Sequence, residues 1–146
     1  MCPGIGDSAR RNAARDPFDL LSESERLAKL SVLVVDDDRD LADTTQTLLE
    51  ILGIQSECAY SAEGALSTLE RNSSINVILS DVIMPGLTGL DLAAIVKARH
   101  PLVGIVLVSG YTSLETIGAR EYVDGFIAKP YKIDEVIVRL IKAMRP

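Results

Sequence analysis

Aromatic residues are scarce in this sequence of 146 residues, which has no tryptophan, four tyrosines and two phenylalanines. A surface that stacks nucleic-acid bases therefore has little to be built from. Basic residues are also outnumbered, because 15 Lys and Arg stand against 21 Asp and Glu and give a formal net charge of −6. Binding to a phosphate backbone needs a basic stripe, so we expect no direct contact with nucleic acid.

Long hydrophobic runs and a cysteine framework are missing as well. No apolar run approaches the roughly 20 residues that a membrane helix needs. The first 30 residues also lack the apolar core of a secretory signal. The two cysteines, Cys2 and Cys58, are too few for a disulfide framework and indicate free thiols in a reducing compartment, with Cys58 as a small core residue. These absences predict a cytoplasmic protein with no membrane association.

Residues 1–30 differ in composition from the remainder of the chain. Pro3, Gly4 and Gly6 precede a basic group between residues 10 and 15, which is typical of a flexible tail. Ser22 and Glu25 then have the spacing of a capping box, so we expect a short helix near residues 22–30. Residues 31–146 are predicted to form one domain.

From residue 31 onward, short β-branched runs alternate with amphipathic helical patterns. The predicted strands cover residues 32–35, 54–60, 77–80, 105–108 and 126–128. The predicted helices cover residues 41–52, with Asp40 as the expected cap, and 62–71, 90–99, 114–122 and 133–144. Strands that alternate with helices in this way predict an α/β fold, a doubly wound five-stranded parallel sheet with helices on both faces.

Polar side chains follow four of the five predicted strands. The first strand is followed by Asp36, Asp37 and Asp38, the third by Asp81, the fourth by Ser109 and the fifth by Lys129. Because ligands of open parallel sheets bind outside the carboxyl ends of the strands, we expect these groups to meet at one edge. Asp38 is interpreted as a solvated residue more readily than as a ligand.

The residue types at this edge indicate a chemistry. Neighbouring carboxylates repel one another unless a cation neutralises them, and oxygen ligands without His or Cys suit a hard ion such as Mg²⁺. A metal ion, an ammonium and a hydroxyl together can hold a phosphoryl group, and one carboxylate can act as the nucleophile. Each residue alone has an ordinary explanation as a cap, a loop serine or a surface charge, so the hypothesis depends on their joint placement.

Four sequence segments carry a resemblance to a known family. They are VLVVDDD at 32–38, LSDVIMPGLTG at 79–89, VLVSGY at 106–111 and GFIAKPY at 125–131. Residues 31–144 resemble the receiver domain of bacterial two-component response regulators, which implies a (βα)5 flavodoxin-like receiver fold behind an N-terminal extension.

The resemblance implies a role for each matching residue. Asp81 would be the phosphoacceptor, with Asp36, Asp37, Asp81 and the backbone carbonyl of Ile83 as the Mg²⁺ ligands. Ser109 and Lys129 would contact the phosphoryl group. Ser109 and Phe126 would form the switch, and a cis Lys129–Pro130 peptide bond would aim the ammonium at the site.

Two departures from the commonest family pattern affect the expected behaviour. Ile83, two residues after the acceptor, has an apolar side chain that cannot orient an attacking water, so we expect a long-lived aspartyl phosphate. The predicted helix at 114–122 contains Gly118 and is weakly amphipathic, so we expect it to be short or mobile.

The family implies a signalling switch that promotes its own phosphorylation and dephosphorylation. Expected partners are a sensor histidine kinase or a histidine phosphotransfer protein, a downstream protein target and, as a further candidate, a second copy forming a homodimer. Three alternatives are open for the setting of such a receiver: a stand-alone regulator, a phosphorelay intermediate, and a receiver fragment of a hybrid histidine kinase or longer regulator.

Rival functions are weaker. Asp36 and Asp38 have the spacing of an aspartyl-nucleophile phosphohydrolase of the haloacid-dehalogenase type, but the threonine expected shortly afterwards is absent. Glycine-rich nucleotide-binding loops are absent too. The intact acidic pair, Asp81 and Lys129 argue against a receiver that serves only as a scaffold. His100, before Pro101 at a predicted helix end, is expected to be solvated and without catalytic function.

Overall fold

The structure, a computed structural model, describes residues 20–110 and 122–144. In chain order its elements are α2 (Glu23–Lys29), β1 (Ser31–Val35), α3 (Arg39–Ile51), β2 (Gln55–Ala59), α4 (Ala62–Arg71), β3 (Val77–Asp81), α5 (Gly89–Arg99), β4 (Gly104–Ser109), β5 (Gly125–Ala128) and α6 (Ile133–Ala143). The predicted helix at 114–122 falls almost wholly outside the described residues. Among the described helices, none has the length and apolar character needed to cross a membrane.

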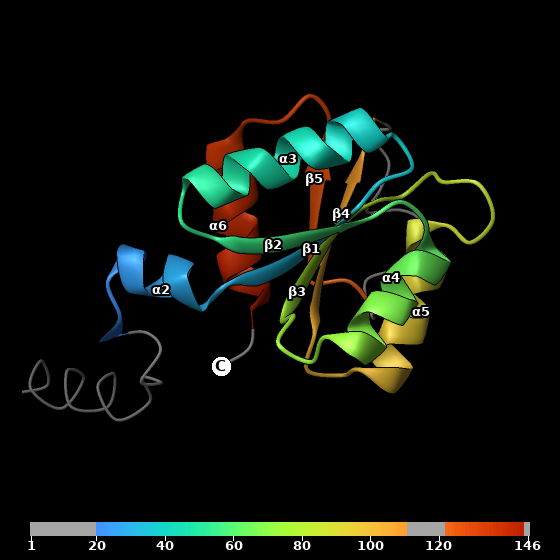
Figure 1. The fold of residues 1–146 in the computed structure, drawn as a ribbon, viewed down its shortest axis with the longest axis horizontal. Coiled ribbons are helices and arrows are strands. Elements are labelled where there is room, and N and C mark those ends of the chain that lie inside the picture. The colour runs from blue at the N-terminus through green and yellow to red at the C-terminus, as the bar shows by residue number, and fades with distance from the viewer. Residues whose placement is uncertain (1–19, 111–121, 145–146) are drawn as a thin grey trace, which may run out of the picture.

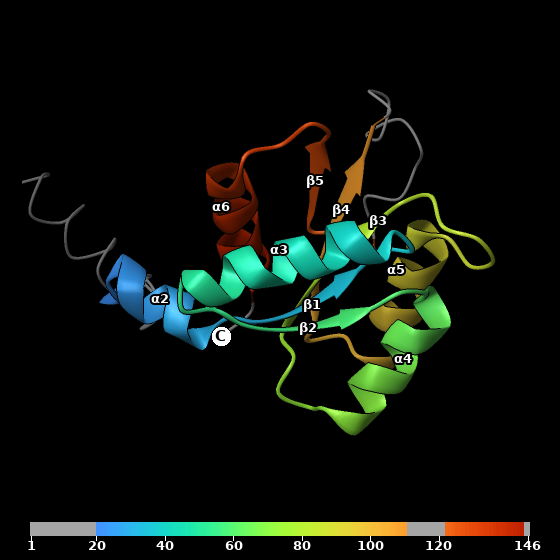
Figure 2. The same cartoon turned by 45° about the horizontal axis from the view of Figure 1, so that its top comes forward.

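The five strands form one parallel sheet in the order β2-β1-β3-β4-β5. Helices α3 and α6 cover one face of this sheet, and α4 and α5 cover the other (Figures 1 and 2). The doubly wound parallel fold predicted from the sequence is therefore confirmed. Since β1 and β3 lie in the middle of the sheet, their carboxyl ends are side by side, and this places Asp36 and Asp37 next to Asp81.

Two hydrophobic clusters, one on each face, hold the layers together. Alternate residues of β1 point to opposite faces: Val32 and Val34 pack with α3 and α6, whereas Leu33 and Val35 pack with α4 and α5. All four side chains are at most 3% exposed. This two-sided burial explains why the strand is a continuous apolar run without alternation.

The start of α3 differs from the prediction. Asp38 is its N-cap, because the Asp38 carboxylate accepts a hydrogen bond of 3.2 Å from the backbone N–H of Leu41. Asp40, the cap expected from the sequence, lies instead in the first turn of the helix. Aspartate is favoured at both positions, since its negative charge complements the positive helix end. The sequence alone therefore does not distinguish the two.

The extension before β1 is joined to the domain. Ser22 and Glu25 form the predicted capping box of α2. Leu30, at the end of this helix, is 1% exposed and belongs to the hydrophobic cluster beneath α3 and α6. The Asn76 side chain accepts from the Ser31 N–H and donates to the Lys29 carbonyl, so the junction between α2 and β1 is fixed to the start of β3.

Candidate functional site

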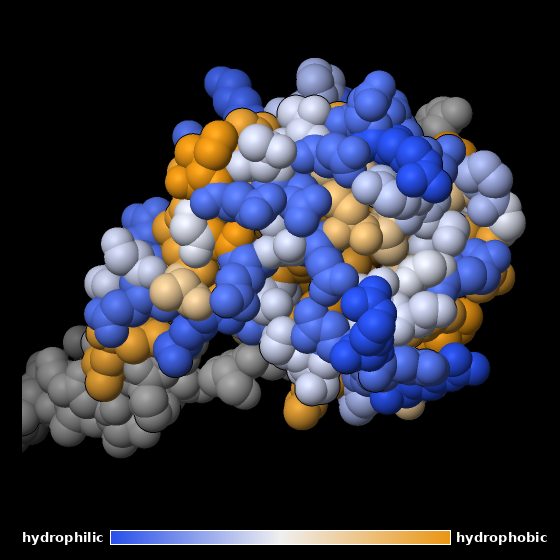
Figure 3. Space-filling model, in the orientation of Figure 1, coloured by the Kyte–Doolittle hydropathy of each residue, from blue (hydrophilic) through white to orange (hydrophobic). Residues whose placement is uncertain are grey.

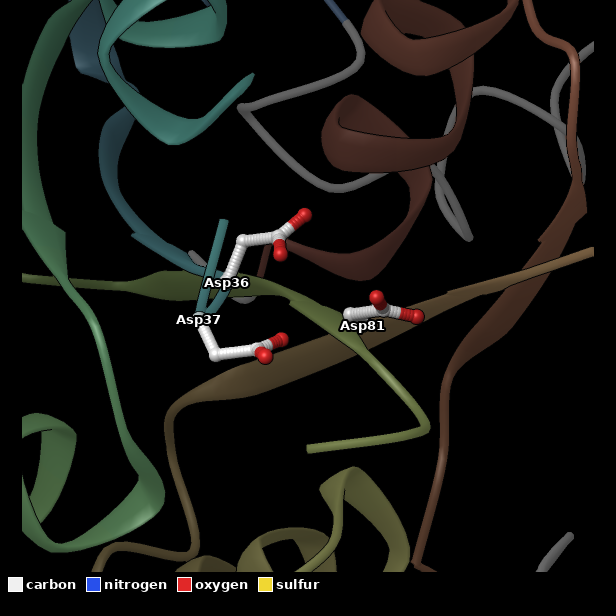
Figure 4. A group of neighbouring side chains, drawn as sticks. All are labelled: Asp36, Asp37 and Asp81. Atoms are coloured by element: carbon white, nitrogen blue, oxygen red, sulfur yellow. The ribbon is translucent and has the colours of Figure 1, made fainter. Parts of the chain in front are cut away.

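Three carboxylates converge at the carboxyl edge of the sheet. Asp36 and Asp37 follow β1, Asp81 ends β3, and the three side chains point toward a common space (Figure 4). One oxygen from each carboxylate lies within 4.8 Å of the other two. The structure thus brings together the three aspartates that the strand ends predicted.

Asp36 is the most buried of the three, with 8% of its surface exposed. Its carboxylate accepts a hydrogen bond of 2.9 Å from the Asp38 N–H. Burial raises the pKa of Asp36, and the nearby charges of Asp81 and Asp37 act in the same direction, whereas the Asp38 hydrogen bond and Lys129 oppose the rise. A buried carboxylate beside two others is a group that a bound cation would stabilise in its charged form.

Lys129 supplies the positive charge of the site. Its Nζ lies 3.3 Å from Oδ2 of Asp81, and the two side chains are 30% and 15% exposed. The Lys129–Pro130 peptide bond is cis, the geometry that the sequence analysis expects. Lys129 and Asp81 are 48 residues apart in sequence, so the pair exists only through the order of strands in the sheet.

Ser109 lies on β4, the strand beside β3, and Phe126 lies on β5, the strand beyond β4. Ser109 ends β4, is 2% exposed, and its backbone carbonyl accepts a hydrogen bond of 2.8 Å from the Lys129 N–H. Phe126 is half-buried in β5, where it pairs with Leu107 and packs against the cluster beneath α4 and α5. The expected hydroxyl is therefore placed on the strand next to Asp81, and the expected aromatic ring lies one strand further along.

The segment between β3 and α5 forms one wall of the site. Ile83 lies in this segment with 54% of its surface exposed. The Gly89 N–H donates to the Val82 carbonyl at 2.8 Å, and a Cβ at Gly89 would collide with the carbonyl oxygen of Asp81. Gly89 thus allows α5 to begin against the backbone of Asp81. The sequence analysis missed this close approach, although a glycine directly after the helix cap Thr88 was a usable signal.

Two other sequence candidates stand apart from the site chemistry. Asp38 is exposed and its carboxylate caps α3, so it does not pair with Asp36 in the manner of a hydrolase acid and nucleophile. His100 is the C-cap residue of α5, at the edge of the sheet opposite the carboxylates.

The donor set fits a small divalent cation. The three nearby groups offer hard carboxylate oxygens, which match the ligand preference of Mg²⁺. The buried position of Asp36 and the raised pKa of its carboxyl also favour a bound positive charge. Residues Asp36, Asp37 and Asp81 are accordingly the side chains that would hold the ion.

Comparison with known proteins agrees with this geometry. The family model of the response regulator receiver domain matches residues 32–141. The nitrogen assimilation regulatory protein NtrX of Azorhizobium caulinodans is 33% identical over 117 residues, which are 77% of this chain and 26% of NtrX. The chain spans between about a quarter and a half of the length of these curated relatives, which include RegX3, DctD and CpxR.

Solved structures show the same likeness. The receiver domain of the Francisella response regulator 1452 is 31% identical, with a TM-score of 0.70, over 77% of this chain and 96% of that one. A response regulator from Burkholderia pseudomallei, with a phosphorylated aspartic acid, calcium ion and citrate, is 26% identical with a TM-score of 0.69. That match covers 76% of this chain and 66% of the other. From the family model, the relatives and the fold together, the chain belongs to the response-regulator receiver domains.

Proposed function

We propose that this domain takes a phosphoryl group onto Asp81 from a histidine kinase or a histidine phosphotransfer protein, and that the modified domain binds a downstream protein. The observation that carries the proposal is the pairing of Asp81 with Lys129 at 3.3 Å beside two further carboxylates. The phosphorylated aspartate of the Burkholderia pseudomallei relative supports it.

The chemistry assigned to Asp81 is nucleophilic attack on phosphorus. A carboxylate oxygen of Asp81 forms the new P–O bond while the bond to the donor breaks, and the donor keeps that electron pair. With a phosphohistidine donor the broken bond is P–N, and the imidazole nitrogen that leaves takes up a proton. The product is an acyl phosphate on Asp81.

The other residues stabilise charge and position the group. Mg²⁺ held by Asp36, Asp37 and Asp81, with the Ile83 carbonyl as a further ligand, would offset the charge of the phosphoryl oxygens. The Lys129 ammonium contacts Asp81 and is placed to pair with a phosphoryl oxygen once the carboxylate has become an acyl phosphate. Ser109 would donate its hydroxyl proton to another oxygen, a charge-assisted hydrogen bond worth about 1.5–3 kcal/mol.

The output of such a domain is a change of binding surface, not a released product. Ser109 ends β4 and Phe126 lies in the adjacent β5, so a movement of the Ser109 hydroxyl toward the phosphoryl group would open space for the ring of Phe126. The new hydrogen bond biases an equilibrium between two conformations. The downstream partner can be a target protein or, in a phosphorelay, a histidine phosphotransfer protein.

Intact-protein mass spectrometry tests the proposal. The protein is incubated with acetyl phosphate and Mg²⁺, with chelator in a parallel sample, and the Asp81→Asn variant is treated identically. One added phosphoryl group that requires Mg²⁺ and is lost in the variant is the expected result. Asp38→Asn is the matched control, because Asp38 caps α3 and should leave the adduct intact.

Three results would overturn the assignment. An adduct that persists in Asp81→Asn would place the nucleophile elsewhere. No adduct on a folded protein, either from acetyl phosphate or from phosphorylated histidine kinases, would leave a receiver that acts as a phosphorylation-independent scaffold. Loss of the adduct in Asp36→Asn but not in Asp81→Asn would favour the hydrolase type of site.

A further inference from the structure

Charge is distributed unevenly between the two edges of the sheet. At the carboxyl edge of the sheet, here called the site edge, each described helix that follows a strand carries acidic residues in its first turn: Asp40 in α3, Glu63 in α4, Asp91 in α5, and Asp134 and Glu135 in α6. With Asp36, Asp37, Asp38 and Asp81 these are nine carboxylates in the described segments between strand ends and first turns. The same segments hold three cationic side chains, those of Arg39, Lys129 and Lys132, so the formal charge of this edge is −6.

The opposite edge has the reverse character. The described last turns hold six cations, in α2 (Arg26 and Lys29), α4 (Arg71), α5 (Lys97 and Arg99) and α6 (Lys142). The described last turns and the segments leading to the next strand also hold three acids, Glu50, Glu70 and Asp124, so the formal charge of this edge is +3.

The parallel topology is the cause of this polarity. Every helix between parallel strands begins at the carboxyl edge of the sheet and ends at the amino edge, so all helix dipoles point the same way. Acidic first turns and basic last turns stabilise each helix separately, and the fold adds their charges at one edge. Figure 3 shows hydrophilic side chains over the end of α3 at which the helix begins.

From this polarity we infer that the charges around the site select the phosphodonor, an inference that rests on the proposed function. The negative potential at the site edge disfavours small anionic donors and favours a donor protein that presents cationic side chains around its phosphohistidine. A bound divalent ion balances two of the negative charges and leaves the edge negative. The selecting residues are the first-turn acids, which surround the reacting groups without belonging to them.

Asp40 and Glu63 are the residues with which to test the inference. Both are exposed, and neither side chain takes part in a hydrogen bond or ion pair among the described residues. Glu63 also reaches the site wall, since its Oε2 is 3.5 Å from the position of a Cβ on Gly86. Replacing both by amides removes two negative charges without altering the acceptor, the lysine or the metal ligands.

The experiment measures the rate of Asp81 phosphorylation by acetyl phosphate at saturating Mg²⁺, at low and at high ionic strength. Screening lengths fall from about 30 Å at 0.01 M salt to about 8 Å at physiological ionic strength, so repulsion of an anionic donor should weaken as salt is added. The wild-type rate should therefore rise with salt. The Asp40→Asn/Glu63→Gln variant should be about threefold faster than wild type at low salt and less salt-dependent.

Two comparisons separate the field from other causes. Glu50→Gln/Glu70→Gln makes the same change in net charge among the exposed residues of the opposite edge, and should leave the rate unchanged. Phosphoramidate, which carries one fewer negative charge than acetyl phosphate at neutral pH, should show a smaller effect of salt and of the Asp40→Asn/Glu63→Gln variant.

Failure of donor selection and failure of the proposed function give different results. Phosphorylation that is flat or falls with salt, or that responds equally to both double variants, would overturn donor selection by the site edge and leave the phosphoacceptor assignment standing. If neither donor phosphorylates the protein at any salt concentration, and phosphorylated kinases do not either, the proposed function fails and the inference fails with it.

Discussion

At the residue scale, the properties of each site group follow from its neighbours. Asp36 and Asp37 are adjacent in sequence and both offer an oxygen to the same group of three carboxylates, yet Asp36 is buried and Asp37 is exposed. Asp36 is thus a buried carboxylate among like charges, which is unfavourable. Of the three aspartates, it is the one whose replacement should change the free energy of unfolding most clearly.

Asp36→Asn should stabilise the metal-free protein at neutral pH. A carboxyl whose pKa is raised by folding binds protons more tightly in the native state, so its stabilising effect is complete below the unfolded pKa of about 3.9 and is lost as the pH rises through the folded value. Asn removes that loss and retains an oxygen to accept from the Asp38 N–H. In the presence of EDTA at pH 7 the variant should melt a few degrees above wild type.

The pH dependence of that difference is the check. The gap in melting temperature between Asp36→Asn and wild type should narrow as the pH is lowered and close below the unfolded pKa of about 3.9, where the Asp36 carboxyl is protonated in both states. A gap that is constant with pH would mean that packing, not charge, separates the two proteins.

Ile83 determines the expected lifetime of the aspartyl phosphate. Its half-exposed apolar side chain stands beside the site and has no group that hydrogen-bonds an attacking water. We expect a half-life of minutes or longer in Mg²⁺, and Ile83→Asn should shorten it several-fold while Ile83→Leu leaves it unchanged. Decay followed by mass spectrometry after donor removal measures this, and a wild-type half-life of seconds would refute it.

Cys58 should be an unreactive thiol. Burial raises its pKa to about 11, helped by the charge of Asp43, and its Sγ lies 3.1 Å from Oε1 of Gln46. Only the thiolate reacts with iodoacetamide, so at pH 8.5 alkylation should be about a hundredfold slower than for a free thiol with a pKa of about 8.5. In a Cys2→Ser background, denaturant should restore the ordinary rate, and rapid labelling of the native protein would contradict the burial.

At the element scale, the sequence predicted most of the architecture because each strand is bounded by a visible signal. The helix predicted at 133–144 is α6 (Ile133–Ala143), and the strand predicted at 54–60 is β2 (Gln55–Ala59). Contacts between distant segments had no such signal. Asn76 holds the α2–β1 junction, and the guanidinium of Arg39 lies 4.2 Å from the ring centre of Tyr60, neither of which a periodicity can predict.

For the site, too, local signals were predictable from the sequence and packing contacts were not. Asp36, Asp37, Asp81 and Lys129 were found because each directly follows an apolar run, and parallel strands align their carboxyl ends. The choice between Asp38 and Asp40 as helix cap depended on one hydrogen bond, and the closeness of Gly89 to Asp81 depended on how α5 packs, so both needed coordinates.

The junction of β3 and α5 makes a sharp test of this packing. A Gly-to-Ala change at a compatible position usually stabilises by about 0.4–1 kcal/mol, but a methyl group on Gly89 would overlap the Asp81 carbonyl. Gly89→Ala should instead cost about 1–3 kcal/mol of unfolding free energy. Gly110→Ala is the matched control, because nothing lies within 4 Å of its Cβ position. Denaturant titration measures the unfolding free energy of both variants, and a neutral Gly89→Ala would contradict the predicted overlap with Asp81.

At the scale of the whole molecule, the proposed metal site is a property of the native fold alone. Asp37 and Asp81 come from different strands, and only the pairing of β1 with β3 brings their oxygens together. An unfolded chain has no such site, so Mg²⁺ must bind the folded state preferentially and stabilise it as a unit. At a concentration one hundred times the dissociation constant, this linkage is worth about 2.7 kcal/mol.

The melting temperature should accordingly rise with the logarithm of Mg²⁺ concentration, and EDTA should reverse the rise. Asp37→Asn removes an exposed ligand while leaving the buried core untouched, so it should fold normally and show a much smaller shift. NaCl at matched ionic strength separates binding from screening, because it relieves repulsion among the carboxylates at the site edge without occupying the site. Equal shifts with both salts, or in both proteins, would mean that the stabilisation comes from screening of this acidic edge and not from an ion held between β1 and β3.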